Sequence, residues 1–291
     1  MSWLRVIIDT GREQSPVVEQ ALEHCGAVSV SFEDRADEPV FELRPGDTPL
    51  WSETRITGLF PADADTSHVI DQVTAALGHV PLHTQIEKLA DQNWERVWLE
   101  RFQPTRVGKR LWICPTHMDP PDPQAVTVFI DPGLAFGSGT HPTTAMCLQW
   151  LADQDLQDKL VIDYGCGSGI LAIAALKLGA RRAIGVDIDP RALEVSLQNA
   201  EINKVSERLL TCLPDSIPQG VQADILVANI LSGPLTQLSA VISQLVAKHG
   251  KIALSGILQA QSEEVRDAYA REFSLQASFR DGWTLLFGAR V

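Results

Sequence analysis

The chain has 291 residues, 45% of them hydrophobic and 21% charged, which is the balance of a globular protein long enough for two domains. Its formal net charge is −13, and residues 1–80, with 14 acidic and 5 basic side chains, account for −9 of it. This acidity argues against a nucleic-acid partner and would attract a basic protein, although it can also serve solubility alone. Five scattered cysteines without a C-x-x-C pair argue against disulfides and a zinc site, and no apolar run is long enough for a signal peptide or a membrane span, so we expect a cytoplasmic protein with no metal and no membrane partner.

The first 88 residues carry a strand and helix pattern of their own. Alternating and β-branched stretches predict strands, and Ser15 with Pro16 at one helix start and Gly78 at another helix end mark helix boundaries. The predicted order is strand 3–9, a helix capped by Ser15 that runs from Pro16 to Cys25, strand 27–33, an irregular insert at 39–47, strand 54–60, helix 66–77 and strand 82–87. This β-α-β-β-α-β order predicts a ferredoxin-like domain over residues 1–88, which we expect to recognise the substrate.

A linker helix is predicted over residues 89–104. Trp94, Trp98 and Phe102 lie at positions i, i+4 and i+8, which places them on one face of a helix. We expect this aromatic face to pack against the domain that follows, and a substrate-binding or hinge surface is the alternative.

Residues 105–291 alternate strands with helices, the order of an open α/β sheet. Strands are predicted at 110–114, 125–131, 160–164, 183–187, 209–213, 223–229 and 250–256, and helices at 142–151, 168–179, 190–203, 234–248 and 260–271. Asp281-Gly282 is a strong hairpin signal between strands 273–279 and 283–289, so the last hairpin should place one antiparallel strand in the sheet.

The most informative segment is residues 161–169, Val-Ile-Asp-Tyr-Gly-Cys-Gly-Ser-Gly. It predicts a buried strand, a glycine-rich turn and a helix whose first amides face a ligand. Asp187 follows Gly165 by 22 positions, the distance expected for a carboxylate that binds ribose hydroxyls. The pattern therefore indicates a nucleoside cofactor; a nicotinamide dinucleotide or a tight turn without a ligand are the alternatives.

The order Asp163-x-Gly165-x-Gly167-x-Gly169 resembles the class I methyltransferases that use S-adenosylmethionine. Three more segments resemble the PrmA family, which methylates ribosomal protein L11: Trp-Glu-Arg-Val-Trp at 94–98, Asp-Pro-Gly-Leu-Ala-Phe-Gly-Ser-Gly-Thr-His-Pro-Thr-Thr at 131–144, and Val-Ala-Asn-Ile-Leu at 227–231. Ser138 departs from the threonine expected there. The resemblance implies a seven-stranded methyltransferase sheet, S-adenosylmethionine as cofactor, and N-methylation of lysine side chains, the N-terminal amine or both in ribosomal protein L11.

The resemblance also implies the site residues. Asn229, at the end of a predicted strand, would contact both the cofactor and the transferred methyl, and its alternative role is a polar cap of the strand. The other expected cofactor contacts are Thr144, Gly165, Gly167, Asp187, Phe136 and Asp163.

Several of these residues also have structural interpretations from their own chemistry. We expect Asp163 to order the loop, with direct support of the cofactor's ammonium group as the alternative. Thr140 and Thr144 are first interpreted as hydroxyls at a helix start. His141 also fits a helix start better than a catalytic base, and Cys166 is a small spacer in the turn.

Two other functions remain compatible with the sequence. One is N-methylation of another protein or of a small amine, and the other is a cofactor-binding assembly factor without turnover. The sequence gives no oligomeric state, and we expect a monomer.

Overall fold

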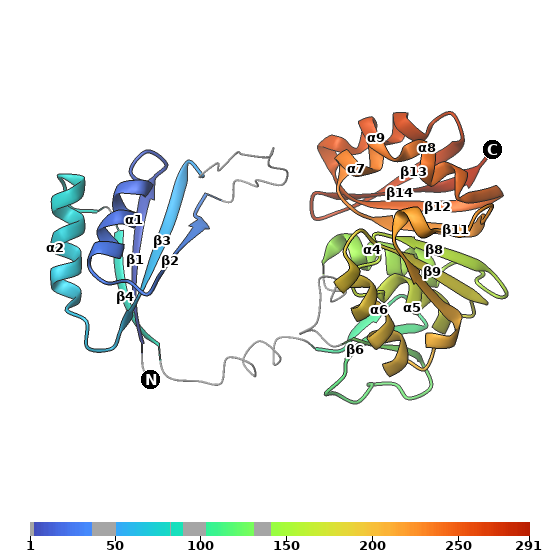
Figure 1. Ribbon diagram of the computed structural model, residues 1–291, viewed down its shortest axis with the longest axis horizontal. Helices are drawn as coiled ribbons and strands as arrows, with labels where there is room; N and C mark the ends of the chain where they lie inside the picture. Colours follow the sequence, from blue (N-terminus) through green and yellow to red (C-terminus); the bar gives the residue numbers. More distant parts are fainter. Residues whose placement is uncertain (1–2, 37–50, 82, 90–102, 131–140) are drawn as a thin grey trace. The chain divides into compact units, whose positions relative to one another are not determined.

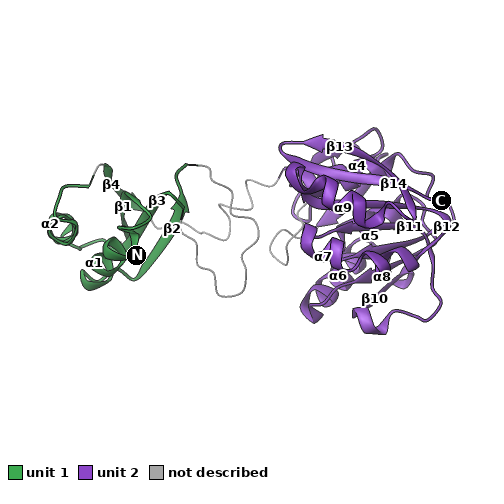
Figure 2. Cartoon of the chain, turned by 90° about the horizontal axis from the view of Figure 1, so that it is seen from above, with its two compact units in different colours: residues 1–97 green, residues 98–291 purple. Residues whose placement is uncertain are grey.

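The computed structural model describes residues 3–36, 51–81, 83–89, 103–130 and 141–291. The chain divides into two compact units, Met1–Val97 and Trp98–Val291 (Figure 2). Within the described residues, no helix is both long and apolar enough to cross a membrane.

The described residues of unit 1 form one antiparallel sheet with two helices. The elements are β1 (Trp3–Gly11), α1 (Ser15–His24), β2 (Ser29–Asp34), β3 (Glu53–Pro61), α2 (Thr66–Leu77) and β4 (His83–Leu89), and the strand order is β2-β3-β1-β4 (Figure 1). Every neighbouring pair of strands is antiparallel. Alternate strand residues such as Val6, Ile8 and Phe60 are buried with Val18 and Leu22 of α1, so one face of the sheet forms the core of this unit.

The helix ends of unit 1 follow the sequence signals in part. Gly78 ends α2 in the left-handed conformation, with φ at 74°, as its position predicted. The start of α2 is capped by Asp65, whose carboxylate accepts hydrogen bonds from the amides of Ser67 and His68. The predicted cap at Ser15 is wrong, because Ser15 is the first residue of α1 and its hydroxyl donates to the carbonyl oxygen of Gly11.

The predicted linker helix and insert lie mostly outside the described residues. The insert at 39–47 is outside them, as are Trp94, Trp98 and Phe102. Leu89, predicted to begin the linker helix, is the last residue of strand β4.

Unit 2 contains a small sheet and a large one. A sheet of order β5-β6-β7 comes first, from β5 (Thr105–Val107), β6 (Leu111–Pro115) and β7 (Val126–Ile130). The large sheet has seven strands in the order β10-β9-β8-β11-β12-β14-β13. Its elements and the helices around it are α4 (Pro142–Ala152), β8 (Leu160–Tyr164), α5 (Ile170–Lys177), β9 (Arg182–Val186), α6 (Pro190–Ile202), η2 (Ser206–Arg208), β10 (Leu209–Cys212), η3 (Pro214–Ser216), β11 (Ala223–Asn229), α7 (Ser232–Gln237), α8 (Ser239–Gln244), β12 (Val246–Leu258), η4 (Gln259–Gln261), α9 (Ser262–Tyr269), β13 (Phe273–Arg280) and β14 (Trp283–Arg290).

Helices cover both faces of the large sheet, which explains why its central strands are almost wholly apolar. On one face, residues of α4, α5 and α6 pack against the strands and against the small sheet. On the other face, residues of α7, α8 and α9 form a second core with Tyr269 fully buried.

Strands β8 to β12 run parallel, and β14 is antiparallel to both of its neighbours. The turn Asp281-Gly282 has positive φ at both residues, 50° and 78°, as a tight hairpin requires. The predicted helix 234–248 is wrong in its continuity and at its end. It is divided into α7 and α8, and strand β12 starts at Val246, which pairs with Ala223 of β11.

The order of the parallel strands reverses between β8 and β11, which lie side by side. In an open α/β sheet, this switch point at the carboxyl ends of the strands is where ligands bind. The glycine-rich segment follows β8, and Asn229 ends β11, so the fold brings two predicted site elements to this point.

Candidate cofactor site at the sheet switch point

The glycine-rich loop has the backbone that its sequence predicted. Gly165, Gly167 and Gly169 all have positive φ, at 80°, 51° and 77°. The amide of Gly165 donates to the carbonyl oxygen of Val186 over 2.7 Å, which ties the loop to the end of β9. A Cβ atom at position 165 would overlap Cγ2 of Ile230, so a glycine is required there on both conformational and steric grounds.

Asp187 lies directly after β9 and holds the glycine loop. Its Oδ2 accepts a hydrogen bond of 2.9 Å from the amide of Gly167, and its Oδ1 accepts one of 3.0 Å from the amide of Asp189. A carboxylate can accept about four hydrogen bonds in all, so both oxygens keep capacity for ribose hydroxyls. Asp187 stands beside the loop and does not line the cavity described below.

Asp163, the next-to-last residue of β8, is buried two positions before the first glycine of the loop. Its Oδ2 accepts a 3.0 Å hydrogen bond from the amide of Ala172 in the first turn of α5, where Gly169 offers no side chain to cap the helix. Its Oδ1 has no partner among the described residues. Burial raises the pKa of Asp163 to about 7, and the charge of Asp187 contributes in the same direction.

Asn229 and Thr144 meet at the mouth of the switch point. The Nδ2 of Asn229, at the end of β11, donates a 3.0 Å hydrogen bond to Oγ1 of Thr144, in the first turn of α4. Thr144 was predicted to hold a helix start, and its hydroxyl instead receives this bond. Asn229 also lines the cavity described below, where the Oδ1 of its amide can accept a hydrogen bond from a ligand.

These residues enclose a cavity of about 580 Å³. Its lining comes from the starts of α4 and α5, the glycine loop, and the ends of β11, β12 and the last hairpin: His141, Thr143, Thr144, Gly165, Cys166, Gly167, Ser168, Ile170, Leu171, Asn229, Ile230, Leu231, Gly256 and Trp283. Within the described residues, no Asp, Glu, Lys or Arg lines it. The cavity is therefore a neutral environment, which disfavours a charged amine.

His141 has the structural role that its place beside Pro142 predicted. It is the N-cap of α4, and its Nδ1 lies 2.7 Å from Oγ1 of Thr143. Burial lowers the pKa of His141, and its ring meets the indole of Trp283 edge-on at 4.8 Å between centroids. Phe136 and Thr140 lie outside the described residues.

Cys166 and the described acidic and histidine residues give no sign of metal or thiol chemistry. Burial raises the pKa of the Cys166 thiol, which keeps it protonated and agrees with its interpretation as a small spacer. No group of His, Cys, Asp or Glu side chains among the described residues is arranged to hold a metal ion.

Sequence reasoning missed three contributors to this site. Ile230 separates Gly165 from Gly256, and a Cβ at either glycine would overlap it. Ser196 and Asn199 of α6 hydrogen-bond the carbonyl oxygens of the glycine loop. The available signal was the 196, 199, 203 spacing of polar residues along one face of a helix, which by itself reads as a solvated face.

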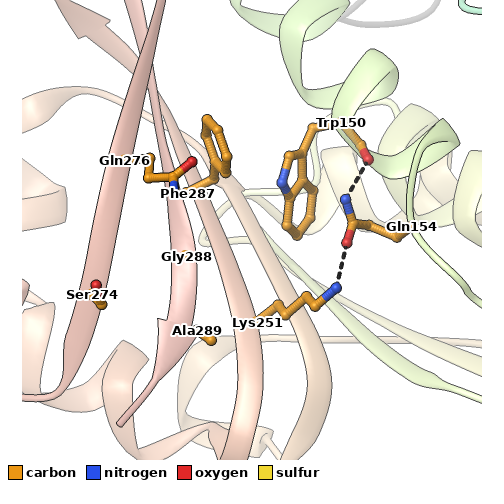
Figure 3. Close-up of a pocket in the computed structure, with 8 residues that line it drawn as sticks. All are labelled: Trp150, Gln154, Lys251, Ser274, Gln276, Phe287, Gly288 and Ala289. Carbon is orange, nitrogen blue, oxygen red and sulfur yellow. Dashed lines mark hydrogen bonds between the residues drawn. The ribbon is translucent and has the colours of Figure 1, made fainter.

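A second hollow of about 370 Å³ lies away from the switch point, between α4 and the strands β12, β14 and β13. Trp150 and Phe287 form its walls, and a chain of hydrogen bonds runs from Lys251 through Gln154 to the backbone of Trp150 (Figure 3). None of the predicted site residues lines it.

The seven-stranded sheet, with its glycine loop and Asn229 at the switch point, defines a Rossmann-like α/β protein of the methyltransferase class. The chain belongs to the ribosomal protein L11 methyltransferase (PrmA) family, whose sequence model matches residues 2–290.

Curated relatives and a solved structure agree with this assignment. The chain is 51% identical over 296 residues to the ribosomal protein L11 methyltransferase of Erwinia tasmaniensis, covering 100% of both chains. It is 49% identical over 291 residues to that of Haemophilus influenzae strain PittEE, covering 99% of this chain and 98% of the relative. The crystal structure of ribosomal protein L11 methylase from Lactobacillus delbrueckii subsp. bulgaricus is similar with a TM-score of 0.59 and 27% identity, over 65% of this chain and 98% of that one.

Proposed function

We propose that this protein is an enzyme that transfers methyl groups from S-adenosylmethionine to amino groups of ribosomal protein L11. The observation that carries the proposal is the family match, which extends over residues 2–290 and is supported by relatives about 50% identical over their whole length. Lysine side chains, the N-terminal amine or both would be the acceptors.

The residues at the switch point fit the proposed cofactor. The loop offers backbone without side chains at Gly165 and Gly167, and Asp187 keeps acceptor capacity for ribose hydroxyls. Thr144 and Asn229 line the same cavity as the loop, and Asp163 accepts a hydrogen bond from the first turn of α5, the helix that follows the loop. We assign cofactor contacts to Thr144, Gly165, Gly167, Asp187 and Asn229, with Phe136 added by family resemblance alone.

S-adenosylmethionine would supply an electrophilic methyl group on a sulfonium. Asn229 is the residue that we assign to the reacting centre, because its Oδ1 is available to accept a hydrogen bond from an amine N–H. A lysine has a pKa of about 10.4, so the neutral amine costs roughly 4–5 kcal/mol at pH 7. The uncharged lining of the cavity lowers that cost, since burial disfavours the ammonium form.

Unit 1 is the part that we assign to substrate recognition. Its β-α-β-β-α-β order and its strand order β2-β3-β1-β4 support a ferredoxin-like domain over residues 1–88, followed by a linker over 89–104 and the cofactor-binding domain over 105–291. The −9 net charge of residues 1–80 suits a basic protein partner and opposes nucleic acid. We propose that the enzyme acts as a monomer in the cytoplasm.

Methyl transfer from radiolabelled S-adenosylmethionine tests the function. Purified ribosomal protein L11 and a whole-cell lysate are each incubated with the enzyme and separated on a gel. Label on the purified protein and at the matching size in the lysate is the expected result. Label only on other proteins or on small amines would show that ribosomal protein L11 is not the substrate. Cofactor binding without any transfer of label would favour an assembly factor.

A further inference from the structure

Helix α6 carries a stripe of three polar residues that are buried. Ser196, Asn199 and Asn203, the residue that ends the helix, have relative exposures of 0%, 0% and 3%. They are three and four positions apart, so they share one face of the helix. Buried polar groups are normally retained for the hydrogen bonds they make, so their partners indicate what the stripe does.

Ser196 fixes the central peptide of the glycine loop. Its hydroxyl donates to the carbonyl oxygen of Gly167 over 2.9 Å, while the backbone amide of Gly167 donates to the carboxylate of Asp187 over 2.9 Å. Gly167 is therefore bonded through both its N–H and its C=O. Ser196 also explains why a glycine is required at position 169, since a Cβ there would lie 2.8 Å from the Ser196 hydroxyl oxygen.

Asn199 holds the next carbonyl. Its Nδ2 donates to the carbonyl oxygen of Ser168 over 2.9 Å, and its Oδ1 has no partner among the described residues. The donor end of the amide is thus the end in use. Gly167 and Ser168 both line the cavity, yet their carbonyl groups are bonded to α6.

From this arrangement we propose that Ser196 and Asn199 are positioning residues for the cofactor. They fix two loop peptides before the ligand arrives, so that binding does not have to order a glycine-rich segment, which is the most costly kind of backbone to order. The inference rests on the proposed function, because the ligand of the loop is taken to be S-adenosylmethionine.

Asn203 supplies a matched control from the same stripe. Its amide clamps the backbone of Phe129 in strand β7, accepting from the N–H over 2.8 Å and donating to the C=O over 2.6 Å. Asn203 also donates to the carbonyl oxygen of Asn199, so its side-chain amide bonds Phe129 and Asn199 and not the glycine loop. Both asparagines can be replaced by aspartate, which has the same shape and keeps an acceptor, and whose ionised form has no donor.

The test compares the full-length variants Asn199→Asp, Ser196→Ala and Asn203→Asp by calorimetry with S-adenosylmethionine and by steady-state kinetics. Loss of a loop bond should raise the Kd and KM for the cofactor roughly tenfold, because a buried carbonyl loses its donor. The kcat at saturating cofactor should stay within about twofold of wild type, since Asn229 and Thr144 are untouched. Asn203→Asp should lower the melting temperature while its Kd stays within about twofold of wild type.

The outcomes separate the inference from the proposed function. Wild-type affinity in both loop variants would overturn the positioning role, and so would an equal loss of affinity in Asn203→Asp. Ser196→Ala removes a single oxygen, so the comparison stands even if Asn199→Asp does not fold. If the wild-type protein itself did not bind S-adenosylmethionine, the proposed function would fall, and this inference with it.

Discussion

Asn229 and Thr144 are joined by a hydrogen bond of 3.0 Å from Nδ2 to Oγ1, although 85 positions separate them in the chain. The bond connects the end of β11 with the first turn of α4 at the wall of the cavity. Because it engages the donor end of the amide, it sets which end of Asn229 is offered to a ligand.

A double-mutant cycle tests whether this pair acts as a unit. Asn229→Ala and Thr144→Val should each lower the single-turnover rate of methyl transfer at saturating cofactor, the latter by about tenfold through loss of one orienting bond. The double variant should be little slower than Asn229→Ala, since residues in contact are not additive. Fully additive effects in rapid-quench measurements would show that Thr144 acts independently of Asn229.

Asp187 and Asp189 provide a second matched comparison, because both lie between β9 and α6. Asp187→Ala should weaken S-adenosylmethionine binding, at about 1.5–3 kcal/mol for each charge-assisted bond lost. Asp189 caps α6 by accepting from the amide of Arg191, so Asp189→Ala should cost about 1 kcal/mol of stability and leave the affinity unchanged. Calorimetry and thermal unfolding measure the two effects, and unchanged affinity in a folded Asp187→Ala protein would remove the ribose assignment.

The contact between Gly165 and Ile230 predicts a compensating pair. Gly165→Ala should abolish cofactor binding, because its Cβ would overlap Cγ2 of Ile230. Adding Ile230→Ala removes that overlap and should restore part of the affinity, although the positive φ at position 165 leaves a residual cost of about 1 kcal/mol. No recovery in the double variant, measured by calorimetry, would show that backbone conformation alone demands the glycine.

Asp163 predicts how stability changes with pH. Burial raises the pKa of its carboxyl to about 7, above the value of about 3.9 for an exposed aspartate, so the folded state holds a proton that the unfolded state loses between these values. Its contribution to the free energy of unfolding is complete below pH of about 4 and is lost as the pH rises to about 7. Asp163→Asn does not titrate and should gain stability relative to wild type across that window.

Urea unfolding of the ligand-free proteins at pH 5, 6, 7 and 8 measures this difference. The advantage of Asp163→Asn should increase up to about pH 7 and then level off. A constant difference at every pH would mean that Asp163 is ionised throughout.

The division of labour between the units gives a last prediction. A protein that begins at residue 103 keeps every described element of the cofactor site and should bind S-adenosylmethionine with nearly the full affinity. It should fail to methylate ribosomal protein L11, because the part assigned to recognition is missing. Raising the salt concentration should weaken the association of the full-length enzyme with its substrate, since surface charges are screened. Full methylation by the truncated protein would contradict the recognition role, and the acidity of residues 1–80 would then be interpreted as serving solubility.

The fold was predictable where local pattern and final environment agree. Strands β8 and β11 have the predicted bounds, because both are apolar runs buried on both faces of the sheet. The predicted end of helix 234–248 was wrong because Val246 is compatible with a helix as well as with a strand. Its pairing with Ala223 of β11 makes it the first residue of a strand.

The sequence predicted that Gly165, Gly167 and Asn229 come together at the switch point, but it did not predict the contacts among the residues there. The glycine spacing and the distance to Asp187 indicated the loop and its partner, and the structure joins them by a hydrogen bond. The bond between Asn229 and Thr144 depends on the reversal of strand order, which no local pattern encodes. Ser196 and Asn199 escaped notice because polar residues on a helix usually face water.

The strand reversal also has a consequence for the lifetime of the protein. The glycine loop extends from β8 and Asn229 from β11, so a ligand that touches both bridges the seam between the two halves of the sheet. Opening of that seam would break the ligand's contacts with one of the two halves. At a concentration of about 100 times its Kd, such a ligand adds about 2.7 kcal/mol against unfolding. The supply of the methyl donor would then govern how fast the protein is degraded as well as how fast it catalyses methylation. In a cell short of the donor, the copies without bound ligand would be the first to be cleaved by proteases.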